Sequence, residues 1–500
     1  MTHEAYTPAQ RALITTALIL ATILSSVAST IANVVLPQIR ASTGAAQDQV
    51  SWVLTSFILA GVLVTPAIGW LETRFGRRMV LLVAIVGYGV ASVLCGFATD
   101  IYAMVAFRLM QGGFGAVFIP MSQAILLDIN PPEKHGQAMS VWGMGAVVGP
   151  IIGPVLGGWL TDNLSWSWVF LMNLPVAVVA FFMISAALPA KHEGEKKPFD
   201  GFGYGFLALG LAGLQIMLDR GPGREWFASP EIWVECGMCL LGFYIFIVHI
   251  ATAKRPLFER SILTDGNFIV ASCMIVFIGV LLFAGAAVLP TLLQTLLNYP
   301  VLHTGIVQIP RGLGSFTAMF LVGRLMGRLD NRLLVLIGVG LTAASYYEMS
   351  QFSLAMDENL VLISGFLQGL GIGLIFVPLS ALAFTTVAPN LRTQAASIFT
   401  LIRNVGSSVG ISMVGALQIY NSKIVQSRLL EQATPDNPNV VAAGADLSSL
   451  QGLAQLARAV ARQAAMVAYI DSFHLLFWLC VLIAPLVLLI RSKRRSFANA

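Results

Sequence analysis

The sequence predicts an all-α polytopic membrane protein, and three observations lead to this fold class. Only 11% of the 500 residues are charged and 57% belong to the apolar set, whereas a soluble domain carries about a quarter charged residues. Apolar runs of about twenty residues recur along the chain, each long enough to cross a bilayer as a helix. These runs lack the alternation of barrel strands, which excludes a transmembrane β-barrel.

Fourteen transmembrane helices are expected. They lie near residues 13 to 36, 50 to 71, 79 to 98, 102 to 126, 137 to 160, 168 to 188, 202 to 218, 232 to 252, 267 to 289, 304 to 326, 333 to 350, 359 to 385, 397 to 420 and 468 to 490. An even number places both termini on one side. Most Lys and Arg residues fall in loops on that side, so the positive-inside rule makes it cytoplasmic. The polar first eleven residues do not read as a signal peptide, so the first helix remains as an anchor.

An internal repeat divides the chain. Gln111-Gly112 in span 4 recurs as Gln368-Gly369 in span 12, a shift of 257 residues. Four small residues of span 5 recur in span 13 at the same shift, namely Ser140, Gly149, Gly153 and Gly158 as Ser397, Gly406, Gly410 and Gly415. Spans 1 to 6 therefore repeat as spans 9 to 14. We expect a six-helix bundle in residues 1 to 200, two additional helices in 201 to 262, and a second six-helix bundle in 263 to 500.

Two parallel six-helix halves are the plan of major facilitator transporters, and several motifs strengthen this resemblance. The chain resembles the fourteen-span drug/proton antiporters of the EmrB/QacA type from about residue 12 to 490. The run from Leu214 to Gly221 and the tract from Trp166 to Pro175 are similar to that branch in particular. The resemblance implies export of amphipathic molecules by alternating access.

The loop after span 2 carries Gly69, Arg74, Gly76 and Arg77 at the spacing of the superfamily's cytoplasmic motif. The resemblance implies that this loop latches the helices of one half in one state of the cycle. A tight turn at Gly76 can place Arg74 and Arg77 against the negative ends of helices. Thr73 stands where the family has an acid, which argues against the usual ion-paired form of the latch. The alternative interpretation is a basic loop that only fixes topology.

Span 4 contains Arg108 and Gln111 in a second superfamily motif, which implies that the arginine assists proton transfer. An arginine inside the membrane costs about 2.5 to 3.5 kcal/mol on insertion scales. It is therefore expected to have a function, or else to be a structural residue bonded to backbone carbonyls.

Span 5 matches the motif that marks antiporters within the superfamily. Its residues are Gly145, Gly149, Pro150, Gly153, Pro154 and Gly157. Small residues every four positions form a face that admits a neighbouring helix at close range, and the two prolines make the helix bendable. A packing motif without a coupling role is the alternative.

Span 1 departs from the antiporter pattern. The tract from Val27 to Asn33 matches the family except that Ala28 replaces the acid that is the family's candidate proton site. A proton-coupled transporter would then need another carboxylate. Glu348 in span 11 and Glu235 in span 8 are the candidates, with Asp128 a weaker third, because burial raises a carboxyl pKa toward neutrality.

Three arginines fall within spans, namely Arg108, Arg311 and Arg403. With few embedded acids, a cavity between the halves would be positive and would favour amphiphilic anions. Residues expected to line this cavity are Ala28, Asn33, Gln111, Arg311 and Arg403. Alternatively, Arg311 and Arg403 lie near helix ends and reach water along their side chains.

Residues 421 to 467 form the only long outer loop. Leu447, Leu450, Leu453, Leu456 and Val460 follow at helical spacing, which predicts a short amphipathic helix. The resemblance implies a periplasmic membrane-fusion adaptor of the EmrA type and an outer-membrane channel as partners. The loop is either a docking surface for the adaptor or a helix on the bilayer.

The predicted function is a multidrug exporter in the inner membrane of a bacterium, coupled to protons. An uncoupled facilitator or a transporter-derived sensor is the alternative, because Ala28 replaces the acid. An intramembrane enzyme is disfavoured, since the His residues near spans are scattered. No cofactor, metal or nucleic acid is expected: Cys236 and Cys239 lack a second pair, the basic residues are dispersed, and no Gly-Lys dipeptide exists for a P-loop.

Overall fold

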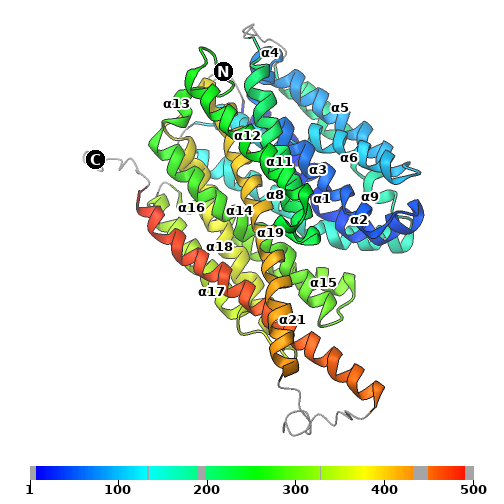
Figure 1. The fold of residues 1–500 in the computed structure, drawn as a ribbon. Helices are drawn as coiled ribbons and strands as arrows, with labels where there is room; N and C mark the ends of the chain where they lie inside the picture. The colour runs from blue at the N-terminus through cyan, green and yellow to red at the C-terminus, as the bar shows by residue number, and fades with distance from the viewer. Residues whose placement is uncertain (1–6, 132–133, 190–197, 327, 432–448, 490–500) are drawn as a thin grey trace.

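The computed structural model describes residues 7 to 131, 134 to 189, 198 to 326, 328 to 431 and 449 to 489, and this part of the chain is helical (Figure 1). The first half contains α1 (Pro8–Thr43), α2 (Gln47–Val50), α3 (Trp52–Val64), α4 (Ile68–Phe75), α5 (Arg77–Gly96), α6 (Ile101–Gly115), α7 (Phe118–Ile129), α8 (His135–Asn163), α9 (Trp168–Leu171) and α10 (Asn173–Ala187). The second half contains α14 (Gly266–Thr295), α15 (Val301–Val307), α16 (Ile309–Leu325), α17 (Asn331–Met349), α18 (Glu358–Phe384), α19 (Arg392–Glu431) and α21 (Leu450–Ile483). Between them lie α11 (Gly201–Arg220), α12 (Pro230–Thr252) and α13 (Arg260–Leu263).

The two halves pack their helices in the same way. In the first half α1 packs on α8 and α10, α6 packs on α3 and α5, and α5 packs on α10. In the second half α14 packs on α19 and α21, α18 packs on α16 and α17, and α17 packs on α21. The repeat read from the sequence therefore corresponds to equivalent helix pairs in space.

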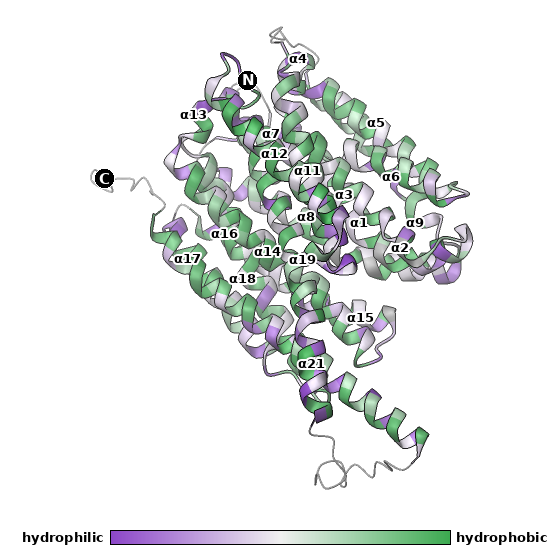
Figure 2. Ribbon diagram, in the orientation of Figure 1, coloured by the Kyte–Doolittle hydropathy of each residue, from purple (hydrophilic) through white to green (hydrophobic). Residues whose placement is uncertain are grey.

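Apolar residues cover most of the helices, and hydrophilic residues gather toward their ends (Figure 2). Twelve helical segments of the described chain are long and apolar enough to cross a membrane. The helices α8 and α17 occupy the other two predicted positions and are not among the twelve. The number of fourteen spans and the orientation of the termini remain predictions.

Both described ends of the chain lie at one end of the bundle, which we call the termini face. Several helices begin with an Asp that accepts hydrogen bonds from free backbone N–H groups, as Asp265 does for Phe268 on α14 and Asp330 does for Arg332 on α17. Such N-caps fix where each helix begins. They place the short loops of the termini face, and with them the site described below.

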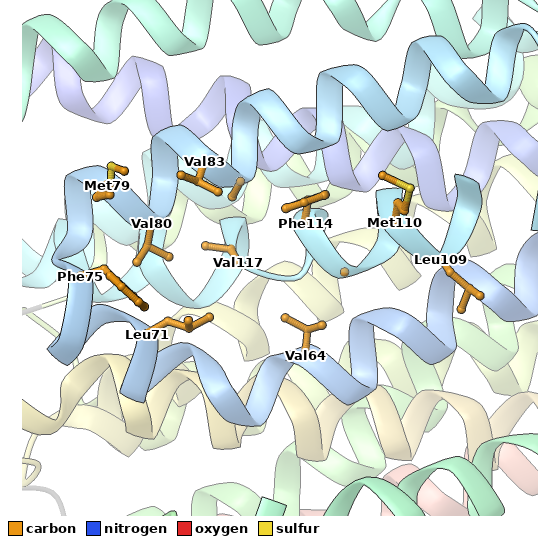
Figure 3. Close-up of a pocket in the computed structure, with 12 residues that line it drawn as sticks. Val64, Leu71, Phe75, Met79, Val80, Val83, Leu109, Met110, Phe114 and Val117 are labelled. Atoms are coloured by element: carbon orange, nitrogen blue, oxygen red, sulfur yellow. The ribbon is translucent and has the colours of Figure 1, made fainter. Parts of the chain in front are cut away.

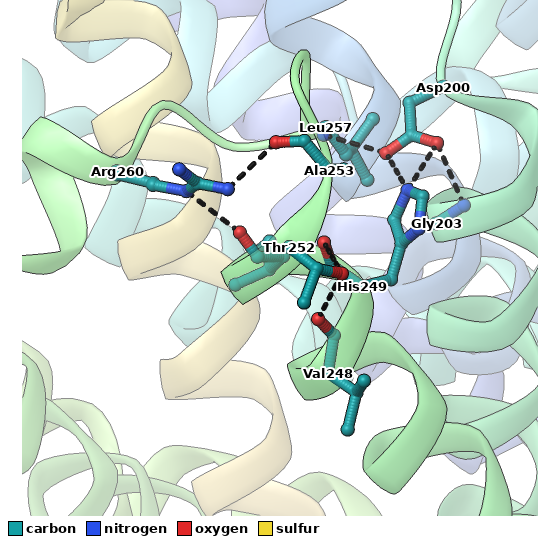
Figure 4. Close-up of polar contacts among 9 residues, drawn as sticks. Asp200, Gly203, Val248, His249, Thr252, Ala253, Leu257 and Arg260 are labelled. Carbon is teal, nitrogen blue, oxygen red and sulfur yellow. Dashed lines mark hydrogen bonds and ion pairs between the residues drawn. The ribbon is translucent and has the colours of Figure 1, made fainter.

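The two additional helices form a pair at the side of the halves. α12 packs mainly on α11, while α11 also contacts α3 of the first half and α19 of the second. On the termini face, Asp200 accepts hydrogen bonds from the Gly203 amide, the His249 ring and the Leu257 amide, each at 2.9 Å (Figure 4). This network ties the segment after α12 back to the start of α11.

The helices α19 and α21 extend past the predicted spans and project from the bundle opposite the termini face (Figure 1). The predicted short amphipathic helix is instead the first part of the continuous helix α21, and Leu447 lies outside the described residues. Arg462 donates to the carbonyl of Leu296 at 2.7 Å and ties α21 to the end of α14. Leu450 and Leu453 are exposed on the projecting part.

Candidate functional site: a buried arginine and an ion-paired contact between halves

Arg108 lies in the interior of the first half and is fully buried. Its Nε donates to the carbonyl of Val53 on α3 at 2.9 Å, and its Nη1 donates to Oε1 of Gln111 at 2.6 Å. Nη2 donates to the carbonyl of Ala28 on α1 at 3.4 Å. The guanidinium also lies 4.3 Å from the centre of the Phe57 ring. Four neighbouring groups thus stabilise a charge that would be costly in the membrane interior.

Gln111 extends this network, because its Nε2 donates to Ser92 Oγ on α5 at 2.7 Å. The structure therefore brings together three of the predicted site residues, Ala28, Arg108 and Gln111. Ala28 is buried, so it does not line an open cavity in this conformation. The side chain of Asn33 lies outside the part of the structure that can be described.

The second half contains a related arrangement built with a different arginine. The repeat shift places Gly365 where Arg108 stands, and Arg311 of α16 fills the space beside it, since a Cβ added at Gly365 would lie 3.7 Å from the Arg311 Cβ. Arg311 Nη2 donates to the carbonyl of Leu282 on α14 at 3.1 Å. In each half, one guanidinium thus donates a hydrogen bond to a backbone carbonyl of the first helix.

A pair of tyrosines that the sequence reading missed supports the same symmetry. Tyr88 donates its hydroxyl to the carbonyl of Leu24 at 2.7 Å, and Tyr346 donates to the carbonyl of Leu281. The carbonyls are 257 residues apart. The two tyrosines are separated by one residue more than the repeat shift of 257, so the repeat in the sequence does not align them.

On the termini face, four charged residues form what we call the ion-pair cluster: Glu72, Arg77, Asp128 and Arg392. Arg77 pairs with Glu72 and also with Asp128, at 2.6 Å from Nη2 to Oδ2. The other oxygen of Asp128 accepts from Arg392 Nη1, also at 2.6 Å. Asp128 belongs to α7 and Arg392 begins α19, so one carboxylate joins the two halves.

The ion-pair cluster differs from the expectation drawn from Thr73. The acids come from Glu72, one position earlier, and from Asp128, which lies outside the motif. Gly76 adopts a φ of 83°, a conformation that favours glycine, and it lets α5 begin directly after α4. Of the arginines expected on helix ends, Arg74 is exposed and Arg77 pairs with carboxylates. Arg78 instead donates to the carbonyl of Ser185 at 2.7 Å.

One close contact beside the ion-pair cluster also joins the halves, and two hydrogen bonds lie near it. A Cβ added at Gly69 would lie 3.1 Å from the Gln394 Cβ. Gln394 in turn donates to the carbonyl of Leu257 at 2.7 Å. His135 at the start of α8 donates from its ring to the carbonyl of Asn130 at 3.1 Å. Burial and the nearby positive charge of Arg392 lower the pKa of His135 below its ordinary value.

The glycine face of α8 packs against α1. The glycines that approach α1 are Gly145, Gly149, Gly153 and Gly157. A Cβ at Gly149 would lie 2.7 Å from the Ser26 Cβ, and one at Gly153 would lie 2.6 Å from the Thr30 Oγ1. Only glycine permits this approach. The side chains of Pro150 and Pro154 lie outside the described part, so the bending of α8 at these prolines stays a prediction.

The candidate coupling acids lie apart from Arg108. Glu348 is near the end of α17 and partly buried, and its Oε2 has no hydrogen-bond partner among the described residues. Glu235 is buried on α12, and its Oε2 also lacks a described partner. A further acid that the sequence reading did not single out is Asp219 on α11, which accepts from Thr55 of α3 at 2.6 Å. It lies in the EmrB-like run that begins at Leu214.

The first half also contains an apolar pocket of about 500 Å³ lined by α3, α4, α5, α6 and the residue before α7 (Figure 3). Phe75, Met79, Val83, Met110 and Phe114 are among its lining residues. It lies within one half rather than between the halves, and it can hold an apolar group but offers no polar partner to orient it. Within the described ranges, no group of three His, Cys, Asp or Glu residues could hold a metal ion.

These features define a class of protein. Two equivalent helical bundles, in each an arginine bonded to a carbonyl of the first helix, and a charged contact between the bundles describe a polytopic membrane transporter. The chain belongs to the major facilitator superfamily, whose family model, described as Major Facilitator Superfamily, matches residues 18–411.

Within this superfamily the chain is similar to multidrug exporters of the EmrB type. It is 33% identical over 430 residues to the multidrug export protein EmrB of Haemophilus influenzae, covering 85% of this chain and 84% of that protein. It is 32% identical to the EmrB of Escherichia coli K12, covering 94% and 93% of the two chains. It is also 32% identical to the fatty acid resistance protein FarB of Neisseria gonorrhoeae, covering 88% and 87%.

Two solved structures share the fold. The human organic anion transporter MFSD10 superposes with a TM-score of 0.62 at 16% identity, covering 95% of this chain and all of that one. The proton:xylose symporter XylE superposes with a TM-score of 0.62 at 13% identity, covering 95% of both chains. At these identities the likeness concerns the fold alone.

Proposed function

We propose that this protein exports amphipathic small molecules from a bacterial cytoplasm in exchange for protons, by alternating access between its two halves. The ion-pair cluster carries the proposal, because Asp128 holds α7 and α19 together and would have to release Arg392 for the termini face to open. With both termini in the cytoplasm and fourteen spans, the described conformation is closed to the cytoplasm.

Proton movement can supply the energy that export needs. One elementary charge crossing 100 mV supplies about 2.3 kcal/mol, which corresponds to a concentration ratio of roughly fiftyfold. Glu348 is the preferred coupling acid, because α17 belongs to the second half and packs on α18 and α21. Glu235 lies on α12, which is outside both halves, so a change in its charge would act on their packing only through α11.

We further propose that the projecting ends of α19 and α21 contact a periplasmic adaptor of the EmrA type, which would connect the exporter to an outer-membrane channel. The exposed Leu450 and Leu453 lie on the projecting part of α21 and would supply an apolar contact. A helix that stays on the outer membrane surface is the alternative use of this segment.

An uncoupled facilitator or a transporter-derived sensor is the second candidate, because Ala28 replaces the family's acid. Resistance of a pump-deficient bacterial host to amphiphiles, with and without the adaptor, tests the exporter. In proteoliposomes, an imposed proton gradient should drive uphill transport. Transport that is indifferent to the gradient would favour the facilitator, and no transport with normal folding would favour the sensor.

A further inference from the structure

Arg403 is an embedded cation in the first third of α19. It lies six residues inside the predicted span that begins at residue 397, which is about 9 Å at the rise of an α-helix and inside a hydrocarbon core about 30 Å thick. Its exposed fraction is 9%. The side chain is thus held in the interior and does not reach water at a helix end.

The guanidinium of Arg403 has poorer hydrogen-bond acceptors than those of Arg108 and Arg311. Its Nη2 donates to Oδ1 of the adjacent Asn404 at 3.3 Å, and its Nε has no hydrogen-bond partner among the described residues. Arg108 has two carbonyls and an amide, and Arg311 has a carbonyl. A buried donor without an acceptor costs about 1 to 3 kcal/mol, so an acceptor that is absent from the chain itself would stabilise Arg403.

One aromatic ring lies over this guanidinium, and a second ring stacks on the first. Phe376 of α18 has its ring centre 5.7 Å from the Arg403 Cζ. The indole of Trp142 on α8 stacks on Phe376, with centroids 6.4 Å apart and planes at 25°. The orientation of the Trp142 indole is fixed by a hydrogen bond, because its Nε1 donates to Thr22 Oγ1 at 2.9 Å.

The three side chains come from both halves. Trp142 belongs to the first half, whereas Phe376 and Arg403 belong to the second. Next to them, a Cβ at Gly143 would lie 3.4 Å from Val377, so the halves touch at this level. When the halves separate, the guanidinium and both ring faces would line the path between them.

We propose that Arg403, Phe376 and Trp142 form the subsite that selects aromatic organic anions as substrates. The two oxygens of a carboxylate can accept from one guanidinium, and a flat aromatic body can stack on the two rings, which are buried here and would be uncovered when the halves separate. No described acid forms an ion pair with Arg403, so nothing in that part of the chain competes for the charge. This inference rests on the proposed export function and names its substrate class.

The test uses two ligands of the same shape and opposite charge, 1-naphthoate and 1-naphthylmethylammonium. Their binding to the full-length protein in detergent is measured by isothermal titration calorimetry. Wild type should bind naphthoate more tightly than the ammonium ligand. Arg403→Gln should weaken naphthoate at least about tenfold, a change of about 1.4 kcal/mol, and leave the ammonium ligand unchanged or tighter.

The matched control is Arg324→Gln. Arg324 also lies over a phenylalanine, with its Cζ 4.0 Å from the Phe320 ring, but it is exposed. Its loss should not change naphthoate binding. If Arg403→Gln does not fold, Arg403→Lys keeps the charge and loses the two-pronged geometry, so a smaller loss is expected. Phe376→Leu should also weaken naphthoate.

Two results would overturn the inference, namely no naphthoate binding by wild type, or equal affinity in wild type and in the folded Arg403 variants. Binding does not require transport, so the two proposals fail separately. A protein that binds naphthoate through Arg403 without moving protons contradicts antiport alone. If the protein exchanges protons but its naphthoate affinity is the same in wild type and in the Arg403 variants, only the subsite is contradicted.

Discussion

The guanidinium of Arg108 donates to the backbone carbonyl of Ala28 across 3.4 Å. The resemblance to drug/proton antiporters predicts an acid at position 28, so the structure places Arg108 beside the position where that carboxylate would lie. A neutral carbonyl, together with Val53 and Gln111, holds the charge instead. The first half therefore has a cation without an acidic partner, whereas an antiporter with an acid at this position could have an ion pair whose carboxylate binds and releases a proton.

Restoring the acid should give transport a new pH dependence. In Ala28→Asp the carboxylate would lie close enough to pair with Arg108, and it would change charge as protons bind. We expect the variant's pH profile of transport in proteoliposomes to gain a titration step that wild type lacks. Ala28→Asn has nearly the same size and cannot titrate, so it should keep the wild-type profile. Equal profiles for the Asp and Asn variants would contradict this role for position 28.

Removing the charge of Asp128 should open the termini face. Asp128→Asn weakens contacts to Arg77 and Arg392 together, at about 1.5 to 3 kcal/mol for a hydrogen bond to a charged group. The ratio of closed to open molecules should fall about tenfold for each 1.4 kcal/mol lost. Electron paramagnetic resonance distances between labels at the exposed Arg74 and Arg328 should lengthen accordingly.

Glu72→Gln is the matched control for Asp128→Asn. Glu72 pairs with Arg77 inside the first half and does not reach Arg392. Its loss should change the label distances little. Equal shifts in the two variants would mean that the contact between halves does not depend on Asp128.

Acid should also favour opening of the termini face through His135. The lowered pKa means that the closed state prefers the neutral ring, so closing releases protons. Stability of the closed state is therefore present above the ordinary histidine pKa of about 6.5, and it is lost as the pH falls below that value and through the lowered pKa of the closed state. His135→Gln should retain more closed state than wild type at pH 5.5 in the same distance measurement. A wild-type shift that is unchanged in the variant would assign the effect to another group.

Two adjacent glycines of α6 should respond oppositely to the same change. A Cβ at Gly112 would lie 2.1 Å from the Phe57 carbonyl oxygen, whereas one at Gly113 would lie 3.4 Å from the nearest Val64 atom. Gly112→Ala should cost about 1 to 3 kcal/mol by overpacking α3 against α6. Gly113→Ala should be neutral or stabilising, because alanine favours helices. Thermal unfolding in detergent compares them, and equal midpoints would contradict this packing.

The helical architecture could be predicted from the sequence because apolar runs of membrane length are a strong signal, and the repeat identified equivalent helices. Helix ends were less predictable. Hydropathy reports where apolar residues stop, but α19 continues to Glu431 and α21 begins at Leu450, beyond the apolar runs. The projecting pair of helices was therefore expected as a loop with a short helix.

Pairs of residues distant in the chain could not be predicted. Asp128 and Arg392 are 264 residues apart and carry no mutual spacing rule, so Thr73 alone argued against an ion-paired latch. Arg403 was expected either in the cavity or at a helix end, and only the burial of its side chain beside Phe376 argues against the helix end. The sequence predicts that Arg108 has hydrogen-bond acceptors, because a buried guanidinium needs them. It does not predict that the Val53 carbonyl is one of these acceptors.

The central claim is that transport is coupled to protons although Ala28 replaces the acid of span 1. The most direct measurement is proton release from the lumen of inverted membrane vesicles, followed with a pH-sensitive dye as substrate is added. We predict substrate-induced proton movement in wild type, its loss in Glu348→Gln, and its retention in Glu235→Gln. Substrate transport without any proton movement in wild type would contradict the claim, and unchanged proton movement in Glu348→Gln would remove Glu348 as its carrier.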